Sequence, residues 1–289
     1  MKISDKLKEK GCSVSFEVFP PKKEDGAESV AAAIDEIAAI GPSFMSVTYG
    51  AGGGTSRYTF ETAERVEKRY GVPVLVHLTC LSSTRETLAA AIDEIRSRGL
   101  ENVMALRGDR AEGVTAASPD FLHASDLIKE LRKNCDGLCV GGACYPEVHP
   151  ESPDQKTDIR YIKEKVEAGC DFLTTQMFFD NNLLYNFLYK LREAGVEVPV
   201  LPGIMPITNA RQVERAVKLS GSFMPQRFRS IVDRFGGDDR AMLQAGVAYA
   251  TDQIIDLFAN GITHVHVYSM NKPEVAREIY ANLSDILGK

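Results

Sequence analysis

A chain of 289 residues with 44% hydrophobic and 26% charged side chains has the composition of a globular protein with a large core. Its net charge of −6, from 34 basic and 40 acidic side chains, argues against general binding to nucleic acid or to membrane surfaces. No apolar run approaches the roughly 18 residues of a membrane span, and the N-terminus has no apolar signal-peptide core. We therefore expect a cytoplasmic protein.

Strand-like and helix-like segments alternate eight times after a short polar lead helix at Ser4–Lys10. The expected strands are Ser13–Phe19, Ser43–Tyr49, Pro73–Thr79, Asn102–Arg107, Leu138–Cys144, Asp171–Gln176, Val198–Ile204 and Thr263–Tyr268. The expected helices are Ala27–Ile40, Arg57–Tyr70, Arg85–Arg98, Asp120–Asn134, Asp154–Ala168, Asn182–Ala194, Asn209–Leu219 and Pro273–Leu287. Continuous apolar strands between helices indicate a parallel sheet, and eight repeats favour an α/β fold closed into a (β/α)8 TIM barrel.

One long segment departs from this alternation. Ser222–Asn260 predicts one or two extra helices before strand eight. No linker or low-complexity tract divides the chain, so we expect a single catalytic barrel domain over residues 1–289. A doubly wound sheet is the alternative fold, but it requires a Gly-x-Gly-x-x-Gly turn after an early strand, and the sequence has none. The glycine-rich segment 50–54 lacks that spacing and predicts a flexible loop near a ligand.

In a barrel of this kind the carboxyl ends of the strands build the functional site. Polar or ionisable residues stand at seven of these ends: Glu17, Thr48, Tyr49, His77, Arg107, Gly108, Asp109, Tyr145, Gln176 and Tyr268. Glu17 shares a strand face with Ser13 and Ser15, and Pro20 and Pro21 end that strand because neither has a backbone N–H. A carboxylate at this place is costly unless something pairs or uses it. Glu17 is therefore the first candidate for chemistry.

Two interpretations stay open for several of these residues. Arg107 and Asp109 either neutralise one another or flank a ligand that approaches the backbone at Gly108. His77 fits a hydrogen-bonded core imidazole as well as a ligand contact. His149 lies on a loop stiffened by two prolines, and there a ligand contact is favoured.

Metal chemistry is not expected. His264 and His266 share one strand face, but metal-dependent hydrolase barrels place such a pair on strand one, which here carries Ser15 and Glu17. We expect both histidines to pack inside the barrel. The six cysteines contain no Cys-x-x-Cys pair and are predicted to be buried structural thiols.

The strand ends together resemble 5,10-methylenetetrahydrofolate reductase, in its bacterial form that consists of the catalytic barrel alone. Seven segments carry the resemblance, in order and over most of the chain: Phe16–Pro21, Val47–Ala51, His77–Cys80, Ala105–Asp109, Tyr145–Glu151, Thr175–Asp180 and Pro202–Pro206. One such motif would be weak, whereas seven in register are specific.

The resemblance implies non-covalent FAD across the barrel mouth, NADH or NADPH as electron donor, a folate substrate and ping-pong kinetics. The implied FAD contacts are Tyr49, Ala51, His77, Arg107, Gly108, Asp109, Ala124, Tyr145, His149, Ser152, Asp158 and Lys165, and Thr48 is implied to bind the cofactor through the nicotinamide. Arg107 and Lys165 would supply positive charge to the pyrophosphate. Asp109 would set the field at the flavin ring or support a cationic folate, and is implied to be catalytic. The implied substrate contacts are Gln176, Gln212, Tyr268 and Lys272.

The resemblance also gives Glu17 a catalytic role. The five-membered ring of methylenetetrahydrofolate must open to an iminium cation before it accepts hydride, and opening needs a proton donor beside the pterin. A carboxyl group in a partly apolar pocket suits this task, because burial keeps it protonated near neutrality.

Two other functions stay open. Ala216 stands where some relatives have a bulky side chain stacking on the bound ligand, so the chain could be a flavin-bearing subunit that receives electrons from a protein partner. Lys272 replaces an arginine that holds the folate tail in some relatives, although it keeps the charge. A non-flavin lyase or aldolase barrel is the other alternative. A homo-oligomer is expected, as in bacterial relatives, without nucleic-acid or membrane partners.

Overall fold

The computed structural model describes residues 1–49, 56–81, 83–108 and 120–288. The predicted glycine-rich loop at 50–54 and the predicted contacts at Ala51 and Asp109 lie outside these ranges.

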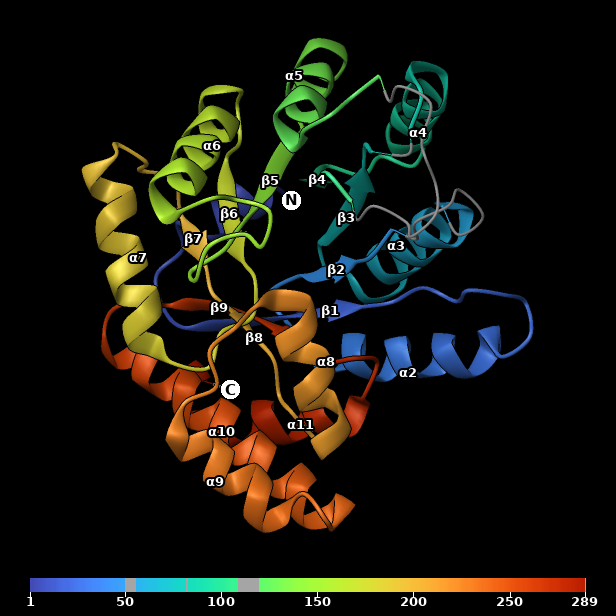
Figure 1. Cartoon of the computed structure of the whole chain (residues 1–289). Helices are drawn as coiled ribbons and strands as arrows, with labels where there is room; N and C mark the ends of the chain where they lie inside the picture. The colour runs from blue at the N-terminus through green and yellow to red at the C-terminus, as the bar shows by residue number, and fades with distance from the viewer. Residues whose placement is uncertain (50–55, 82, 109–119, 289) are drawn as a thin grey trace.

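The strands of the described residues form one parallel sheet that curves into a barrel ringed by helices (Figure 1). They are β1 (Ser13–Val18), β2 (Met45–Val47), β3 (Val74–Thr79), β4 (Asn102–Leu106), β5 (Cys139–Cys144), β6 (Phe172–Thr175), β7 (Val200–Leu201), β8 (Gly203–Ile204) and β9 (His264–Tyr268). Neighbours run in the order β7-β6-β5-β4-β3-β2-β1-β9-β8, all parallel. The predicted (β/α)8 barrel class is confirmed.

The predicted continuous strand Val198–Ile204 is wrong in detail. Pro202 divides it into β7, which pairs with β6, and β8, which pairs with β9. Proline has no N–H to donate to a ladder, so it stands between two short strands that face different neighbours. Its carbonyl still accepts the N–H of His266 at 2.8 Å. The two ends of the sheet therefore meet through this one bent segment.

The helices alternate with the strands. They are α1 (Ile3–Lys6), α2 (Ala27–Ala39), α3 (Ser56–Tyr70), α4 (Arg85–Ser97), α5 (Ala124–Asn134), α6 (Gln155–Glu167), α7 (Asn181–Glu193), α8 (Ala210–Ser220), α9 (Gln226–Phe235), α10 (Asp239–Ala259), α11 (Pro273–Asn282) and α12 (Ser284–Leu287). The predicted last helix is broken at Leu283, whose side chain is fully buried and whose backbone is not helical. Among the described helices none combines the length and apolar character that crossing a membrane requires.

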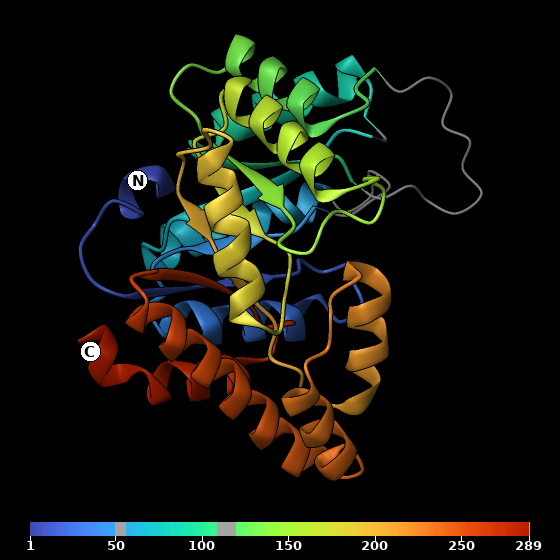
Figure 2. The same ribbon diagram turned by 60° about the vertical axis from the view of Figure 1, so that its left-hand side comes forward.

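The outer-ring helix between α7 and α11 is α10, not the helix predicted at Asn209–Leu219. α10 packs against α7, α9, α11 and β8. α8 lies instead on the side of the barrel where the loop after β5 emerges (Figure 2). The reason is a separate apolar cluster in which Ala216 of α8 joins Phe179, Met205, Ile207 and Phe228.

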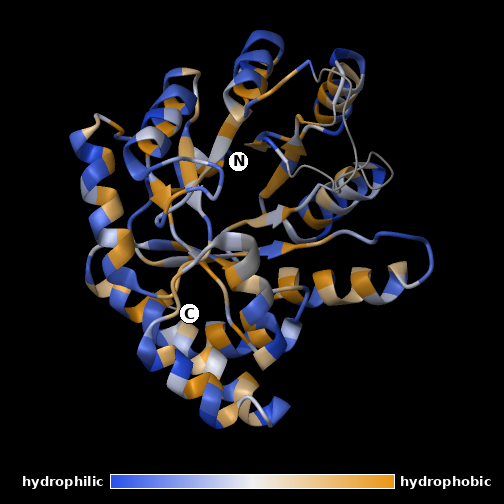
Figure 3. Ribbon diagram, in the orientation of Figure 1, coloured by the Kyte–Doolittle hydropathy of each residue, from blue (hydrophilic) through white to orange (hydrophobic). Residues whose placement is uncertain are grey.

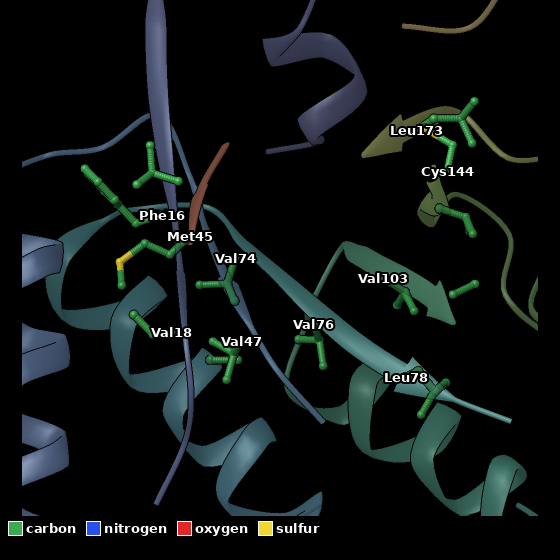
Figure 4. Close-up of a cluster of buried hydrophobic side chains, with 14 of the residues drawn as sticks. Phe16, Val18, Met45, Val47, Val74, Val76, Leu78, Val103, Cys144 and Leu173 are labelled. Carbon is green, nitrogen blue, oxygen red and sulfur yellow. The ribbon is translucent and has the colours of Figure 1, made fainter. Parts of the chain in front are cut away.

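Two apolar layers hold the barrel together. The outer layer lies between strands and helices and contains Phe16, Val18, Val47, Val76 and Leu173 (Figure 4). The helices turn their apolar faces toward the sheet and their polar faces outward (Figure 3). An inner cluster fills the amino-terminal half of the barrel with Phe44, Leu75, Met104, Cys139, Phe172 and Leu201, and Ile3 of α1 closes it.

The predicted lead helix is shorter than expected, since α1 ends at Lys6 rather than Lys10. Five of the six cysteines are buried thiols as predicted, whereas Cys12 is only partly buried.

Candidate active site

Glu17 lies on the inner face of β1 near the mouth of the barrel. Strand alternation sends Val14, Phe16 and Val18 to the outer apolar layer, so Glu17 points inward. The parallel register places Glu17 beside Ser46 of β2 and Tyr268 of β9. Its side chain is 13% exposed, and its Oε2 lies 3.7 Å from Nε2 of His77 on β3. Residues of β2, β3 and β9 thus surround the carboxyl group of Glu17.

The interior changes the protonation of both groups. Burial raises the pKa of Glu17 to about 8 and lowers the pKa of His77 to about 4. Near pH 7 the carboxyl group is mostly protonated and the imidazole is neutral. Their separation is within range for an ion pair, but two uncharged groups at 3.7 Å form neither an ion pair nor a hydrogen bond. Glu17 is held as an acid that can give up a proton.

Beneath this pair, His266 is a neutral interior residue. The Ser15 hydroxyl donates to the Val265 carbonyl at 3.0 Å, so it accepts from Nδ1–H of His266 at 2.8 Å. Nε2 is then the acceptor for the Ser46 hydroxyl at 2.9 Å. Burial lowers the pKa of His266 to about 3, and its ring stacks on Phe44. This is the interior packing role predicted for this histidine.

His264 lies one layer further toward the amino-terminal end of the barrel, where its Nδ1 is 2.8 Å from the hydroxyl of Ser13. In the parts of the chain that the structure describes, no three His, Cys, Asp or Glu side chains come together as a metal site.

Tyr268, a predicted substrate contact, is anchored to the barrel. Its hydroxyl donates to the Thr175 carbonyl at 2.6 Å. The ring lies against Gly203, where a Cβ would overlap the Tyr268 ring and the Thr175 carbonyl. Burial, and next the nearby Glu17, raise the pKa of Tyr268, so the phenol stays protonated. Tyr268 thus forms a fixed wall beside the acid.

Arg107 follows β4 and pairs with Glu151, a residue that the sequence did not single out. Its two terminal nitrogens reach the two carboxylate oxygens of Glu151, both at 2.6 Å. Such a bidentate pair fixes the plane of the guanidinium group. The predicted pairing with Asp109 lies outside the described residues. Glu151 could have been suspected, because it closes the Tyr145–Glu151 motif that carries Tyr145 and His149.

Gly108 has a φ of +88°, and a Cβ there would lie 3.1 Å from Cβ of Thr79. Both the backbone conformation and the lack of space require glycine at this strand end.

The loop after β5 is braced from below by Asp158. This carboxylate, in the first turn of α6, accepts the N–H of His149 at 3.2 Å and the hydroxyl of Ser152 at 3.1 Å. The imidazole of His149 packs edge-on against Tyr145, with ring centroids 4.6 Å apart. Burial, followed by the nearby Arg107, lowers the pKa of His149. Val148 has a φ of +82°, a strained conformation for a β-branched residue.

The other predicted cofactor contacts come from the end of β2 and from α5 and α6. Thr48 and Tyr49 follow β2, and the Tyr49 ring meets Phe60 edge-on. Ala124 is the first residue of α5. Lys165 lies in the last turn of α6, where its ammonium group donates to the Ala143 carbonyl and burial lowers its pKa. Lys165 is therefore turned into the layer between α6 and β5.

Two of the predicted substrate contacts meet at one residue. Thr208 donates its N–H to the side-chain oxygen of Gln212 at 2.8 Å, and its hydroxyl accepts from Lys272 at 2.5 Å. A hollow of about 430 Å³ opens beside them, lined by Thr208, Asn209, Arg211, Asp239, Leu243, Lys272 and Glu274. Gln176 lies apart at the end of β6, where its side-chain oxygen accepts the N–H of Met177.

The larger hollow, of about 530 Å³, lies at the opposite end of the barrel and is lined by Ser13, His264 and Tyr280 among others. The mouth remains the better candidate for chemistry, because the perturbed acid and the cationic side chains gather there.

These residues fit a flavin dinucleotide. A guanidinium group suits a pyrophosphate, and the edge-on pair of Tyr145 and His149 places two aromatic rings on the neighbouring loop. The fit has one condition. Arg107 is paired with Glu151, so a bound phosphate would have to share or replace that carboxylate.

The barrel and its protonated carboxyl group define a (β/α)8-barrel protein with an acid poised at the mouth. The chain belongs to the methylenetetrahydrofolate reductase family, whose model matches residues 2–284. It is 31% identical over 267 residues to the Escherichia coli 5,10-methylenetetrahydrofolate reductase, covering 92% of this chain and 89% of that one. It is 35% identical over 302 residues to "Methylenetetrahydrofolate reductase (NADH) 1" of Arabidopsis thaliana, covering 98% of this chain.

The chain spans about half the length of the plant relatives that it matches, 51% in the case of the Arabidopsis protein. Among solved structures, a Clostridium thermocellum protein described as binding two copies of 5-methyl-5,6,7,8-tetrahydrofolic acid aligns with a TM-score of 0.69. The alignment covers 100% of this chain and 99% of that one at 16% identity, which shows a shared fold and no more.

Proposed function

We propose that this protein reduces 5,10-methylenetetrahydrofolate to 5-methyltetrahydrofolate with FAD and a reduced nicotinamide, and that Glu17 is the general acid. One observation carries the proposal beyond family membership. An inward carboxyl group at the barrel mouth has its pKa raised by burial to about 8, beside an imidazole that stays neutral. A protonated acid at this place can supply the proton that the substrate requires for opening of its five-membered ring.

Glu17 would give its proton to a nitrogen of the five-membered ring as the C–N bond breaks, which leaves an iminium carbon ready for hydride. Neutral His77 keeps positive charge away from Glu17. An imidazolium at 3.7 Å would favour the carboxylate and remove the acid. Tyr268 closes one side of the pocket with its phenol fixed to Thr175.

Residues on β2 to β6 and their loops would hold the cofactor. Arg107 would bind the pyrophosphate, Tyr145 and His149 would contact the ring system, and Gly108 would allow close approach. The chemistry that FAD supplies when bound is two-electron hydride transfer, first from the nicotinamide and then to the folate. Gln212 and Lys272 would hold the folate from the other side of the mouth.

The alternative of a protein electron donor rested on Ala216. In the structure Ala216 is 3% exposed and packs within the cluster under α8, so it gives no separate support for an altered nucleotide site. NADH, which the name of the Arabidopsis relative specifies, is the donor we propose to test first, with NADPH second.

The experiment compares wild-type protein with Glu17→Gln under anaerobic conditions. We expect the wild-type flavin to bleach with NADH and also with 5-methyltetrahydrofolate in the reverse direction. Glu17→Gln should bind FAD and bleach with NADH, whereas its reaction with the folate should fall by about 10² to 10⁴. Glu278→Gln on the exposed face of α11 is the matched control and should behave as wild type.

Full folate activity in Glu17→Gln would remove Glu17 from the acid role. Flavin that binds but stays oxidised with 5-methyltetrahydrofolate would reject the substrate, and absence of flavin binding would reject the cofactor. Bleaching by the folate but by neither nicotinamide would point to a protein donor.

A further inference from the structure

The turn that follows β9 is hydrogen-bonded to the backbone of Glu17 and of Phe19, two residues further along the chain. β9 ends at Tyr268, which is the register partner of Glu17. Ser269, the next residue, is buried and donates its hydroxyl to the Glu17 carbonyl at 2.9 Å. The chain then turns sharply, and the Lys272 N–H donates to the Ser269 carbonyl at 3.0 Å.

Asn271 continues this contact two residues beyond Glu17. Its side-chain oxygen accepts the N–H of Phe19 at 2.8 Å, and its side-chain nitrogen donates to the carbonyl of the same residue at 2.8 Å. A carboxamide that accepts and donates in this way takes the place of one peptide unit in a β-ladder. Pro20 cannot continue the ladder, because it has no N–H. The Asn271 carboxamide therefore makes the two backbone hydrogen bonds at Phe19 that a neighbouring strand would otherwise make.

The turn that carries Asn271 has a strained backbone at two successive residues. Met270 and Asn271 both have a φ of +54°, which non-glycine residues rarely adopt in succession. Asparagine tolerates this conformation better than most residues, whereas methionine does not. The turn accepts this strain, and as a result the Asn271 carboxamide faces Phe19. The next residue, Lys272, is the N-cap residue of α11 and a proposed substrate contact.

We propose that Asn271 is a positioning residue for Glu17, which sets the height and burial of the acid through the backbone of Phe19. The inference rests on the proposed role of Glu17 as the acid. Asn271 acts on the strand end and does not touch the reacting atoms. Because the same turn carries Lys272, it links the position of the acid to the position of the substrate.

The test compares Asn271→Ala with Asn102→Ala, a matched control at the other end of the barrel. Asn102 makes the same kind of clamp there, accepting the Ile3 N–H at 2.7 Å and donating to the Met1 carbonyl at 3.1 Å. Both variants should lose stability. Only Asn271→Ala should slow reoxidation of the reduced flavin by methylenetetrahydrofolate, by on the order of tenfold to 100-fold at pH 8. Reduction by NADH should not change.

The pH dependence separates positioning from general loosening. A Glu17 carboxyl group released toward water has a lower pKa, so the fall in the folate step with rising pH should begin at lower pH in Asn271→Ala. The defect should therefore be smaller at pH 6 than at pH 8. The titration of the Glu17 carboxyl carbon, followed by NMR in flavin-free protein and assigned with Glu17→Gln, should shift the same way. Asn102→Ala should leave both midpoints unchanged.

A folded Asn271→Ala protein with an unchanged Glu17 titration would overturn the inference. If that variant does not fold, Ser269→Ala decides, since it removes only the bond to the Glu17 carbonyl. A shift to lower pH supports positioning, and no shift rejects it. The NMR titration needs neither flavin nor folate, so it gives its answer even if the proposed reaction fails.

Discussion

Glu17 illustrates how a proposed catalytic residue can oppose folding. The unfolded chain loses the Glu17 proton above a pKa of about 4.5, whereas the folded protein keeps it until about pH 8. The folded state therefore binds more protons across this interval, and its stability falls as pH rises through it. Below the lower value both states are protonated and the cost is absent. Above pH 8 the full cost remains.

Glu17→Gln should therefore stabilise the protein at alkaline pH although it slows the folate step. A difference of about 3.5 pKa units at 1.36 kcal/mol each sets an upper limit of about 5 kcal/mol. We expect a gain of about 2–4 kcal/mol in the free energy of unfolding at pH 8.5 and almost none at pH 4.5, measured by urea titration. His77 is present in both proteins, so its own pH dependence largely cancels in the comparison.

Equal stability of wild type and Glu17→Gln at pH 8.5 would mean that the carboxyl group is not buried as the structure has it. Glu278→Gln, which also removes one acidic side chain, is the control and should show no pH-dependent gain.

At the scale of elements, the position of α10 depends on one glycine. A Cβ on Gly246 would overlap the backbone carbonyl of Ile207, in the loop between β8 and α8. The helix can approach that loop only because the residue has no side chain. Thr208, the next residue of the loop, holds Gln212 and Lys272. The packing of α10 thus reaches the side of the mouth where we propose that the substrate binds.

Gly246→Ala should destabilise the protein by at least about 3 kcal/mol, although alanine favours helices by about 1 kcal/mol over glycine. The overlap is with backbone, which cannot rotate away. Gly237→Ala is the matched control, because it adds the same methyl group beside α10 with nothing within 4 Å. Thermal unfolding of the two variants measures the difference, and a near-neutral Gly246→Ala would show that α10 can shift without cost.

The barrel was predictable because its signal is local and repeated. Apolar strands and amphipathic helices alternate eight times, and each unit contributes independently to the prediction. The predicted identity of the outer-ring helix was wrong because α8 has a strongly one-sided apolar pattern in its sequence, whereas α10 has almost none. Only tertiary packing decides which of the two helices covers the sheet. That decision depends on the close approach at Gly246 and on the cluster around Phe228.

Part of the candidate site was also predictable from the sequence. Glu17 and His77 come together because parallel strands end at one edge, which strand position alone indicates. The pairing of Arg107 with Glu151 spans 44 residues, and no local pattern encodes it. The contact of Asn271 with Phe19 spans 252 residues and depends on two left-handed residues, Met270 and Asn271. The proposed flavin contacts at Ala51 and Asp109 lie in the undescribed part of the chain.

Considered as a whole, the molecule separates stability from chemistry along the barrel axis. The amino-terminal half is filled with large apolar side chains and closed by Ile3. The mouth carries Glu17, His77 and the paired Arg107 instead. Barrels of this kind commonly divide their two ends in this way. We therefore expect substitutions in the amino-terminal half of the barrel to lower the free energy of unfolding without changing the pKa of Glu17.

Ile3→Ala tests that division. Ile3 is fully buried against Phe44, Leu75 and Phe172, so removing three carbons should cost about 2–4 kcal/mol in the free energy of unfolding. The pH midpoint of the folate step should remain where it is in wild type, because the inner cluster separates Ile3 from Glu17. Ile286→Ala, at a 44% exposed position on α12, is the control and should cost well under 1 kcal/mol. A shifted midpoint in Ile3→Ala would show that the packing of the closed end sets the burial of Glu17, and that the two ends of the barrel are coupled.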